Sequence, residues 1–145
     1  MPTINPSDLT GFDILVTGAG RGLGKAAAKM LAGCGAKVIG VSRTEIELRN
    51  LKNEIEQDGG WAEIATLDVT NLDAVRSFIN KLPKLDAVIN NAGWNHPQHV
   101  LDVDDITFDA MIDINLRATF AVAQAAARRF KREGIKGSIV NMSSQ

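Results

Sequence analysis

Short apolar runs alternate along this chain with longer segments in which apolar residues recur at helical spacing. The runs cover residues 13–17, 37–41, 62–67, 85–89 and 138–142. Most are apolar nearly throughout, which indicates strands that are buried on both faces of a sheet. Buried strands separated by helices predict an α/β fold with a doubly wound parallel sheet. We therefore expect one domain over residues 1–145, with no internal linker or repeat.

The helical spacing occurs in four segments, residues 23–34, 48–55, 72–82 and 111–130. In the third, Thr70 followed by Asp73 resembles a capping box that opens a helix. The apolar face of the first helix is expected to carry Leu23, Ala27, Met30, Leu31 and Cys34. The last segment is expected to present one stripe of Met111, Ile112, Asn115, Thr119, Phe120, Ala123, Ala127 and Phe130.

Composition excludes several functional classes. The net charge of −1 offers no basic field for nucleic acid or an anionic membrane. No apolar stretch approaches the roughly 18 residues of a membrane span, and the first residues lack the pattern of a secretory signal, so we expect a cytoplasmic protein. His96 and His99 lie in a loop without further ligands, so we expect no metal site.

A glycine cluster, T-G-A-G-R-G-L-G at residues 17–24, lies between the first strand and the first helix. Glycines in this place let backbone approach a pyrophosphate, and the helix that follows offers free N–H groups and a positive dipole end. The G-x-G-x-x-G fingerprint is not met because residue 23 is leucine, and T-G-x-x-x-G-x-G stands instead. The alternative is a plain tight turn.

With N-N-A-G at residues 90–93 closing the fourth strand, the chain resembles the short-chain dehydrogenase/reductase family over nearly its whole length. Among the members, it looks most like NADP(H)-dependent carbonyl, sugar or polyol reductases, with 3-oxoacyl-carrier reductases as a further possibility. The resemblance implies a Rossmann fold with strand order 3-2-1-4-5 and the fifth strand as an open apolar edge. It assigns the cofactor turn to Gly18, Gly22 and Gly24 and a phosphate contact to the backbone of Leu23. It assigns contact with the adenosine ribose and stabilisation of the sheet to Asn91, Ala92 and Gly93.

The end of the second strand bears on the choice of cofactor. An acidic residue there would accept a hydrogen bond from the ribose 2′-hydroxyl of NAD. Here Ser42 and Arg43 stand instead, and Arg21 offers a second cation from the glycine loop. A hydroxyl and two guanidinium groups favour a 2′-phosphate, so we expect NADP(H) to be preferred and NAD(H) to be possible. The alternative for each arginine is a solvated surface charge.

Asp68 and Val69 follow the third strand, at the sheet edge where such folds bind ligands. The resemblance assigns Asp68 to the adenine edge, with Val69 beside it. The alternative for Asp68 is a carboxylate at a helix N-terminus, and one side chain can serve both roles.

Two catalytic candidates follow from the resemblance. Asn115 would lie in a kinked helix and hold a water that leads toward a catalytic lysine; the alternative is a structural hydrogen bond from a buried amide to backbone. Ser144, at the end of the fifth strand, would polarise the carbonyl of a small-molecule carbonyl or alcohol substrate. The family proton donor is a tyrosine in Tyr-x-x-x-Lys, and this chain has no tyrosine.

We therefore expect an oxidoreductase of NADP(H) in an incomplete chain, with the carboxyl-terminal strands missing and no activity on its own. The alternative is a catalytically silent dinucleotide-binding module. The resemblance also implies a homo-oligomer, formed by the full-length protein through the long helix that contains Asn115 and Phe120.

Overall fold

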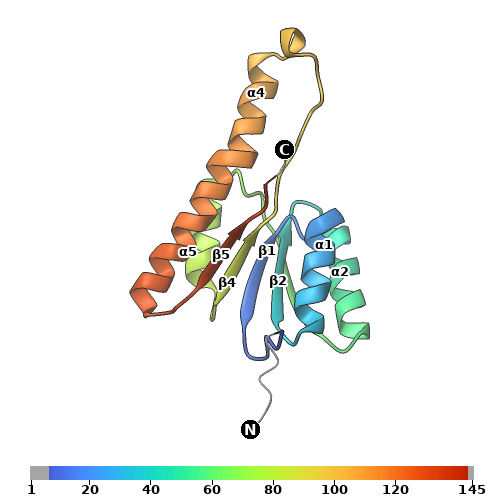
Figure 1. Cartoon of the computed structure of the whole chain (residues 1–145), viewed down its shortest axis with the longest axis vertical. Helices are drawn as coiled ribbons and strands as arrows, with labels where there is room; N and C mark the ends of the chain where they lie inside the picture. Colours follow the sequence, from blue (N-terminus) through green and yellow to red (C-terminus); the bar gives the residue numbers. More distant parts are fainter. Residues whose placement is uncertain (1–6, 144–145) are drawn as a thin grey trace.

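Five parallel strands form the centre of the protein, in the order β3-β2-β1-β4-β5 (Figure 1). The computed structural model describes residues 7–143. The predicted strand order is confirmed, and the predicted boundaries differ from the observed ones by at most two residues at either end. The strands are β1 (Asp13–Thr17), β2 (Lys37–Ser42), β3 (Trp61–Thr66), β4 (Ala87–Asn90) and β5 (Ser138–Asn141).

Helices cover both faces of this sheet, as a doubly wound fold requires (Figure 1). On one face, α1 packs against β1 and β2, and α2 packs against β2 and β3. On the other face, α5 packs against β4 and β5 and also against α3. The helical elements are α1 (Gly22–Gly33), α2 (Glu45–Gln57), α3 (Leu72–Lys81), η1 (Val100–Asp102), α4 (Asp105–Ile112), η2 (Asp113–Ala118) and α5 (Thr119–Glu133).

The two faces of the sheet bury separate hydrophobic clusters. In α2, the predicted face of Leu48, Leu51 and Ile55 is fully buried against the sheet. In α3, Val75 and Ile79 are buried against the other face, as their spacing predicts. Burial of each such side chain contributes roughly 1.5–3 kcal/mol, so these faces hold the helices that frame the carboxyl edge of the sheet.

The predicted apolar face of α1 is only partly right, because Leu31 packs against the core but Leu23 and Met30 do not. Ala28 and Ala32 are buried in the core, whereas Leu23 and Met30 are 72% and 67% exposed. Small side chains let this helix lie close to β1 and β2, and larger ones would hold it away. The helical spacing of the segment was right, but it could not show which side of the helix faces the sheet.

The predicted stripe of the long helical segment is also wrong. The segment is not one regular helix, because η2 is a π-helical turn between α4 and α5. A π turn adds a residue to the repeat and so shifts the phase of everything that follows. Phe120 is therefore 63% exposed, and of the predicted stripe only Phe130 joins the core. The side chains that are buried instead are Ala118, Ala121, Val122, Ala125, Ala126 and Arg129.

The predicted capping box at the start of α3 does not form. Asn71 is the N-cap, and its side chain accepts a hydrogen bond from the Ala74 N–H at 3.1 Å. The Thr70 hydroxyl donates to Asp68 instead. The side chain of Asn71 therefore caps the helix in place of Thr70.

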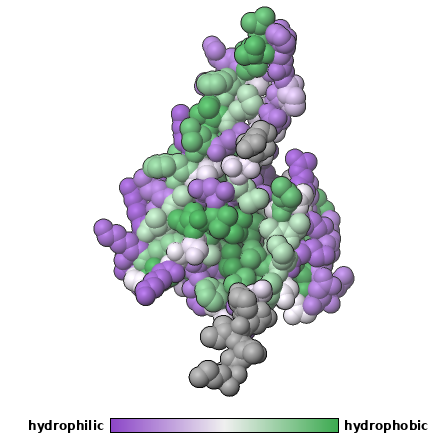
Figure 2. Space-filling view, viewed as in Figure 1, coloured by the Kyte–Doolittle hydropathy of each residue, from purple (hydrophilic) through white to green (hydrophobic). Residues whose placement is uncertain are grey.

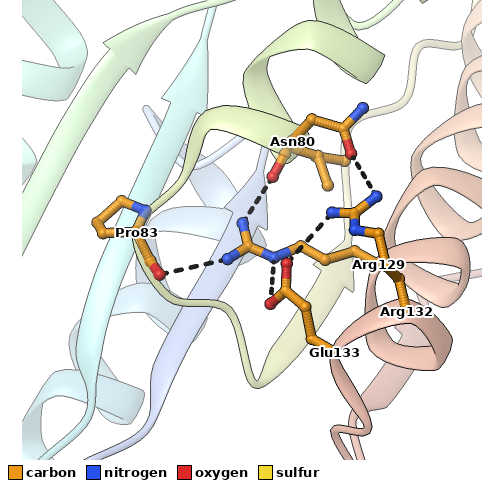
Figure 3. A network of polar contacts seen from close by, with 6 residues as sticks. Asn80, Pro83, Arg129, Arg132 and Glu133 are labelled. Atoms are coloured by element: carbon orange, nitrogen blue, oxygen red, sulfur yellow. Dashed lines mark hydrogen bonds and ion pairs between the residues drawn. The ribbon is translucent and has the colours of Figure 1, made fainter.

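Arg129 is a charged side chain in the core, only 3% exposed. Figure 3 shows its guanidinium between the end of α3 and the chain that follows. It donates to the carbonyl oxygens of Ile79 at 2.7 Å and Pro83 at 3.3 Å, and it pairs with Glu133 at 3.1 Å. Burial raises the pKa of the Glu133 carboxyl, but the hydrogen bonds from Arg129 and Arg132 lower it further than burial raises it. Arg129 thus ties α5 to the end of α3.

Part of the sheet surface is apolar and open. In Figure 2, hydrophobic residues gather where β1, β4 and β5 face the viewer. Val140 of β5 is opposite Ile89 of β4 in the register and is 45% exposed. Within residues 7–143, β5 pairs with β4 alone, so the prediction of an open apolar edge at the fifth strand is confirmed for the described part of the chain.

Candidate functional site

A cavity of about 450 Å³ opens at the carboxyl ends of β1 to β4. Chain order reverses there, since β2 and β3 lie on one side of β1 and β4 on the other. Open α/β sheets bind their ligands at such a switch point. The cavity brings together all of the predicted cofactor residues except Gly24. Its lining residues are Gly18, Gly20, Arg21, Gly22, Leu23, Ser42, Arg43, Thr44, Glu47, Leu67, Asp68, Val69, Asn91, Ala92, Gly93 and Ile114.

The glycine loop forms one wall of the cavity. Two of its glycines adopt backbone conformations that other residues rarely adopt. Gly18 and Gly22 have φ values of +64° and +55°. A Cβ at Gly18 would lie 2.9 Å from the Cα of Ala92, so the turns that follow β1 and β4 can lie this close only because residue 18 has no side chain. A Cβ at Gly22 would meet nothing within 4 Å and would project into open space. Gly22 therefore leaves room for a ligand against the backbone.

Gly24 lies behind this wall and does not line the cavity. It is buried, and a Cβ there would collide with the Gly18 carbonyl and the Asn91 side chain. Its role is to let α1 start close to the loop. The first N–H groups of α1 have no partner within the helix, and they give this end of the cavity a positive potential.

Two arginines and a serine form the end of the cavity beside β2. Arg21 is the N-cap of α1, and Arg43 follows Ser42 directly. Both guanidinium groups are exposed, and neither has an ion pair within residues 7–143. The Ser42 hydroxyl accepts a weak hydrogen bond from the Thr44 N–H at 3.3 Å. The two cations are thus available to an anion.

Asp68 lies on the wall formed by the end of β3. Its carboxylate accepts hydrogen bonds from the Thr70 N–H at 2.9 Å and the Thr70 hydroxyl at 2.8 Å. Burial raises the pKa of this carboxyl, but the hydrogen bonds from Thr70 and the positive charge of Arg43 outweigh it, and the net pKa is lowered. Asp68 orders the turn before α3 yet does not cap the helix. Val69 is buried beside it.

Asn91 connects the ends of β1 and β4. Its amide donates to the carbonyl oxygens of Thr17 at 3.1 Å and Gly18 at 3.2 Å. The Thr17 hydroxyl in turn accepts from the backbone N–H groups of Asn91 and Ala92, both at 3.0 Å. These bonds fix the floor of the cavity. The side-chain N–H groups of Asn91 are therefore engaged with the backbone of β1 and the glycine loop.

Asn115 was expected to be buried, and this expectation is wrong. The residue is exposed in η2, and its side chain binds backbone, which was the structural alternative. Its oxygen accepts from the Trp94 N–H at 2.9 Å, and its amide donates to the Trp94 carbonyl at 2.7 Å. Asn115 therefore positions the loop after β4, where Trp94 stacks on His96 with 5.6 Å between ring centroids.

The second catalytic candidate, Ser144, lies outside the described residues. The cavity and the loop held by Asn115 are therefore the parts of the predicted site that the structure describes.

The family model described as short chain dehydrogenase matches residues 13–145. This match takes in every strand and helix of the structure. The chain belongs to the short chain dehydrogenase family.

Individual members of the short chain dehydrogenase family agree in sequence and in structure. Human L-xylulose reductase is 36% identical over 137 residues, which are 94% of this chain and 54% of that protein. A short-chain type dehydrogenase/reductase from Mycobacterium marinum superposes with a TM-score of 0.93 at 34% identity, over 99% of this chain and 60% of that one. A gluconate 5-dehydrogenase from Burkholderia cenocepacia in complex with NADP and tartrate gives a TM-score of 0.87 at 32% identity, over 95% and 55%. The chain spans about half the length of the curated relatives it matches.

Several lining residues were not predicted from the sequence. Gly20, Thr44, Glu47, Leu67 and Ile114 also face the cavity. For most of them, adjacency to a predicted residue was the available signal. Glu47 is different, because it lies on α2, five residues after Ser42, and only the fold brings it to the wall.

Within the described range, no helix combines the length and apolar character that crossing a membrane requires. Among the same residues, no three histidine, cysteine or acidic side chains gather where a metal ion could bind.

Proposed function

We propose that this chain forms the NADP(H) site of an oxidoreductase that transfers a hydride between NADP(H) and a small-molecule carbonyl or alcohol. The observation that carries the proposal is one cavity, at the switch point of the sheet, lined by a glycine loop, two unpaired arginines and an aspartate. Its volume of about 450 Å³ lies in the usual range for cofactor sites. Family membership and the NADP complex of a relative support it.

The residues present fit the anionic parts of this cofactor. The open backbone at Gly22 and the N–H groups that begin α1 would hold the pyrophosphate. Arg21, Arg43 and the Ser42 hydroxyl would hold the 2′-phosphate, since guanidinium groups bind phosphate oxygens through charge-assisted, bidentate hydrogen bonds. Within residues 7–143, neither arginine makes an ion pair or a side-chain hydrogen bond that would have to be broken first.

The remaining walls would hold the adenosine. Asp68 keeps an ionised carboxylate that can accept hydrogen bonds from the adenine edge, with Val69 beside it. The backbone of Ala92 and Gly93 would face the ribose. Asn91 would act indirectly, by fixing that backbone against β1.

When bound, the nicotinamide would supply or accept the hydride. Ser144 would donate a hydrogen bond to the substrate oxygen, as the family resemblance implies. Asn115 would position the loop that carries Trp94 beside this region. The chain has no tyrosine to donate the proton, so we propose that these 145 residues bind the dinucleotide without appreciable turnover.

A titration of NADPH and NADH into the chain, followed by cofactor fluorescence, tests the proposal. NADPH should bind more tightly than NADH. Arg43→Ala should weaken NADPH binding roughly tenfold or more and leave NADH within about twofold, because a charge-assisted hydrogen bond is lost. Arg128→Ala removes an exposed arginine on α5 and is the control. Equal or reversed preference in the wild type would contradict the assignment to NADP(H).

An assay of carbonyl reduction, run beside the titration, tests the expected lack of turnover. We expect the purified 145 residues to bind NADPH without reducing a carbonyl substrate. Robust turnover would contradict this part of the proposal, as it would contradict the alternative of a catalytically silent dinucleotide-binding module.

We further propose that the full-length protein self-associates through the helix that runs from α4 to α5. Ile106, Phe108, Leu116 and Phe120 are between 53% and 82% exposed on it. Apolar side chains of this size, gathered on one helical segment, are typical of an interface between subunits.

A further inference from the structure

Glu47 places a carboxylate in the wall of the cavity, beside Ser42. It lies in the first turn of α2 and is half-buried. A Cβ built on Gly20 would lie 2.7 Å from Oε2 of Glu47 and 3.1 Å from the Ser42 hydroxyl. The carboxylate and the hydroxyl therefore both lie close to Gly20, at the arginine end of the cavity.

The Glu47 carboxylate has no protein partner within the described residues. Thr44 and Glu47 have the spacing of a capping box, but Thr44 makes no side-chain cap, and its N–H donates to Ser42 instead. In the same turn, Glu45 pairs with Arg49 at 2.6 Å. The fold thus leaves one half-buried carboxylate unpaired, and that carboxylate faces the cavity.

We propose that Glu47 is a specificity-determining residue that opposes the 2′-phosphate and favours a ribose with a free 2′-hydroxyl. This inference rests on the proposed function. A carboxylate repels a phosphate that carries between one and two negative charges, and it accepts a hydrogen bond from a hydroxyl. The preference for NADP(H) that Arg21 and Arg43 create is therefore narrower than the two arginines alone would give.

The variant Glu47→Gln removes the charge and keeps the shape of the side chain. The dissociation constants of NADPH and NADH are measured for it by fluorescence titration, at low salt where the charge effect is largest. We expect NADPH to bind about tenfold more tightly than to the wild type, because one repulsion at short range is removed. NADH should bind within about twofold of the wild type or more weakly.

Glu45→Gln is the matched control. It removes the same charge from the same turn of α2, but Glu45 does not line the cavity. It therefore reports any effect that acts through net charge or the helix dipole, and it should leave both dissociation constants within about twofold. Thermal melts of the variants establish that each is folded, and Glu47→Ala replaces the glutamine variant if that one is not.

A second pair of ligands removes the nicotinamide from the comparison. The compounds 2′,5′-ADP and 5′-AMP differ only by the 2′-phosphate, and Glu47→Gln should tighten the first of them alone. The proposal is overturned if both ligands of a pair change by the same factor, or if Glu45→Gln has the same effect as Glu47→Gln. A wild-type chain that binds neither dinucleotide contradicts the proposed function and this inference with it. Binding by the wild type with no selective effect of Glu47→Gln contradicts this inference alone.

Discussion

Asp68 holds a negative charge at the cavity wall at a cost in desolvation. Burial opposes its ionisation, but the two hydrogen bonds from Thr70 and the charge of Arg43 favour it more strongly. The folded protein therefore binds a proton at Asp68 less readily than the unfolded chain does. A lowered pKa in the folded state makes the protein more stable wherever the carboxyl is ionised.

The pH dependence of Asp68→Asn tests this balance. The folded pKa lies below the ordinary value of 3.8, so the contribution of the charge is present above about pH 4. It is lost as the pH falls through the lowered pKa. We expect the melting temperature of the wild type to exceed that of Asp68→Asn at pH 7, and the difference to shrink steadily in thermal melts below pH 4.

The exposed Asp109, on α4, gives the control, and Asp109→Asn should melt like the wild type at pH 7. A melting-temperature difference between the wild type and Asp68→Asn that stays the same from pH 7 to pH 3 would contradict the role given to the charge.

For single residues, the sequence predicted which ones line the cavity but not which groups their side chains contact. Eleven of the twelve predicted cofactor residues line the cavity, because chain order alone takes them to the carboxyl edge of a parallel sheet. The partners of Asn115 and the place of Glu47 depend on contacts across the fold. No local pattern shows that an amide at 115 will bind the backbone at 94, or that a helix residue will face a loop 27 positions earlier.

At the scale of single elements, the strands and helices were predictable where their apolar pattern had one interpretation. The face of α2 was predicted because its apolar residues form a single stripe. In α1 the sequence offers two apolar stripes, one of alanines and one of larger residues. The alanine stripe is buried against the sheet because small side chains allow close approach. The π turn of η2 could not be predicted, since a local insertion in the repeat leaves no mark in composition.

The contact between α3 and α5 depends on one buried charge. Replacing Arg129 with methionine keeps much of its apolar volume but leaves the carbonyl oxygens of Ile79 and Pro83 without their donor. We expect Arg129→Met to lower the free energy of unfolding by about 2–4 kcal/mol in urea denaturation, since buried acceptors are costly to leave unpaired.

The neighbouring Arg132 is 55% exposed and makes longer contacts, with Asn80 at 3.4 Å and Glu133 at 3.2 Å (Figure 3). Arg132→Met should therefore cost less than about 0.5 kcal/mol. Equal losses in the two variants would show that the contact between these helices does not depend on the buried guanidinium.

At the scale of the whole molecule, the protein has a cavity at the carboxyl edge of its sheet and two exposed apolar surfaces elsewhere. One is the helix from α4 to α5, which extends beyond the sheet in Figure 1. The other is the face over β4 and β5. Strand order and cavity position follow from the alternation of elements, but exposure of these surfaces depends on what lies against them and so was only partly predictable.

The proposed self-association can be measured by sedimentation velocity over a range of concentrations. We expect Phe120→Ser to raise the concentration of half-association roughly tenfold or more, because each copy loses a large apolar contact. Ile46→Ser is the matched control, since Ile46 is also 63% exposed but lies on α2. If both variants associate as the wild type does, the α4–α5 surface is not the interface.

We propose above all that the cavity at the carboxyl ends of β1 to β4 holds a dinucleotide. Backbone amide chemical shifts, measured as NADPH is added to the labelled chain, test it most directly. We expect the largest changes in residues 18–24, 42–44, 67–69 and 91–93, with little change in the distant end of α5. Changes that centre on the open face of β4 and β5 or on α4, or no change at saturating NADPH, would contradict it.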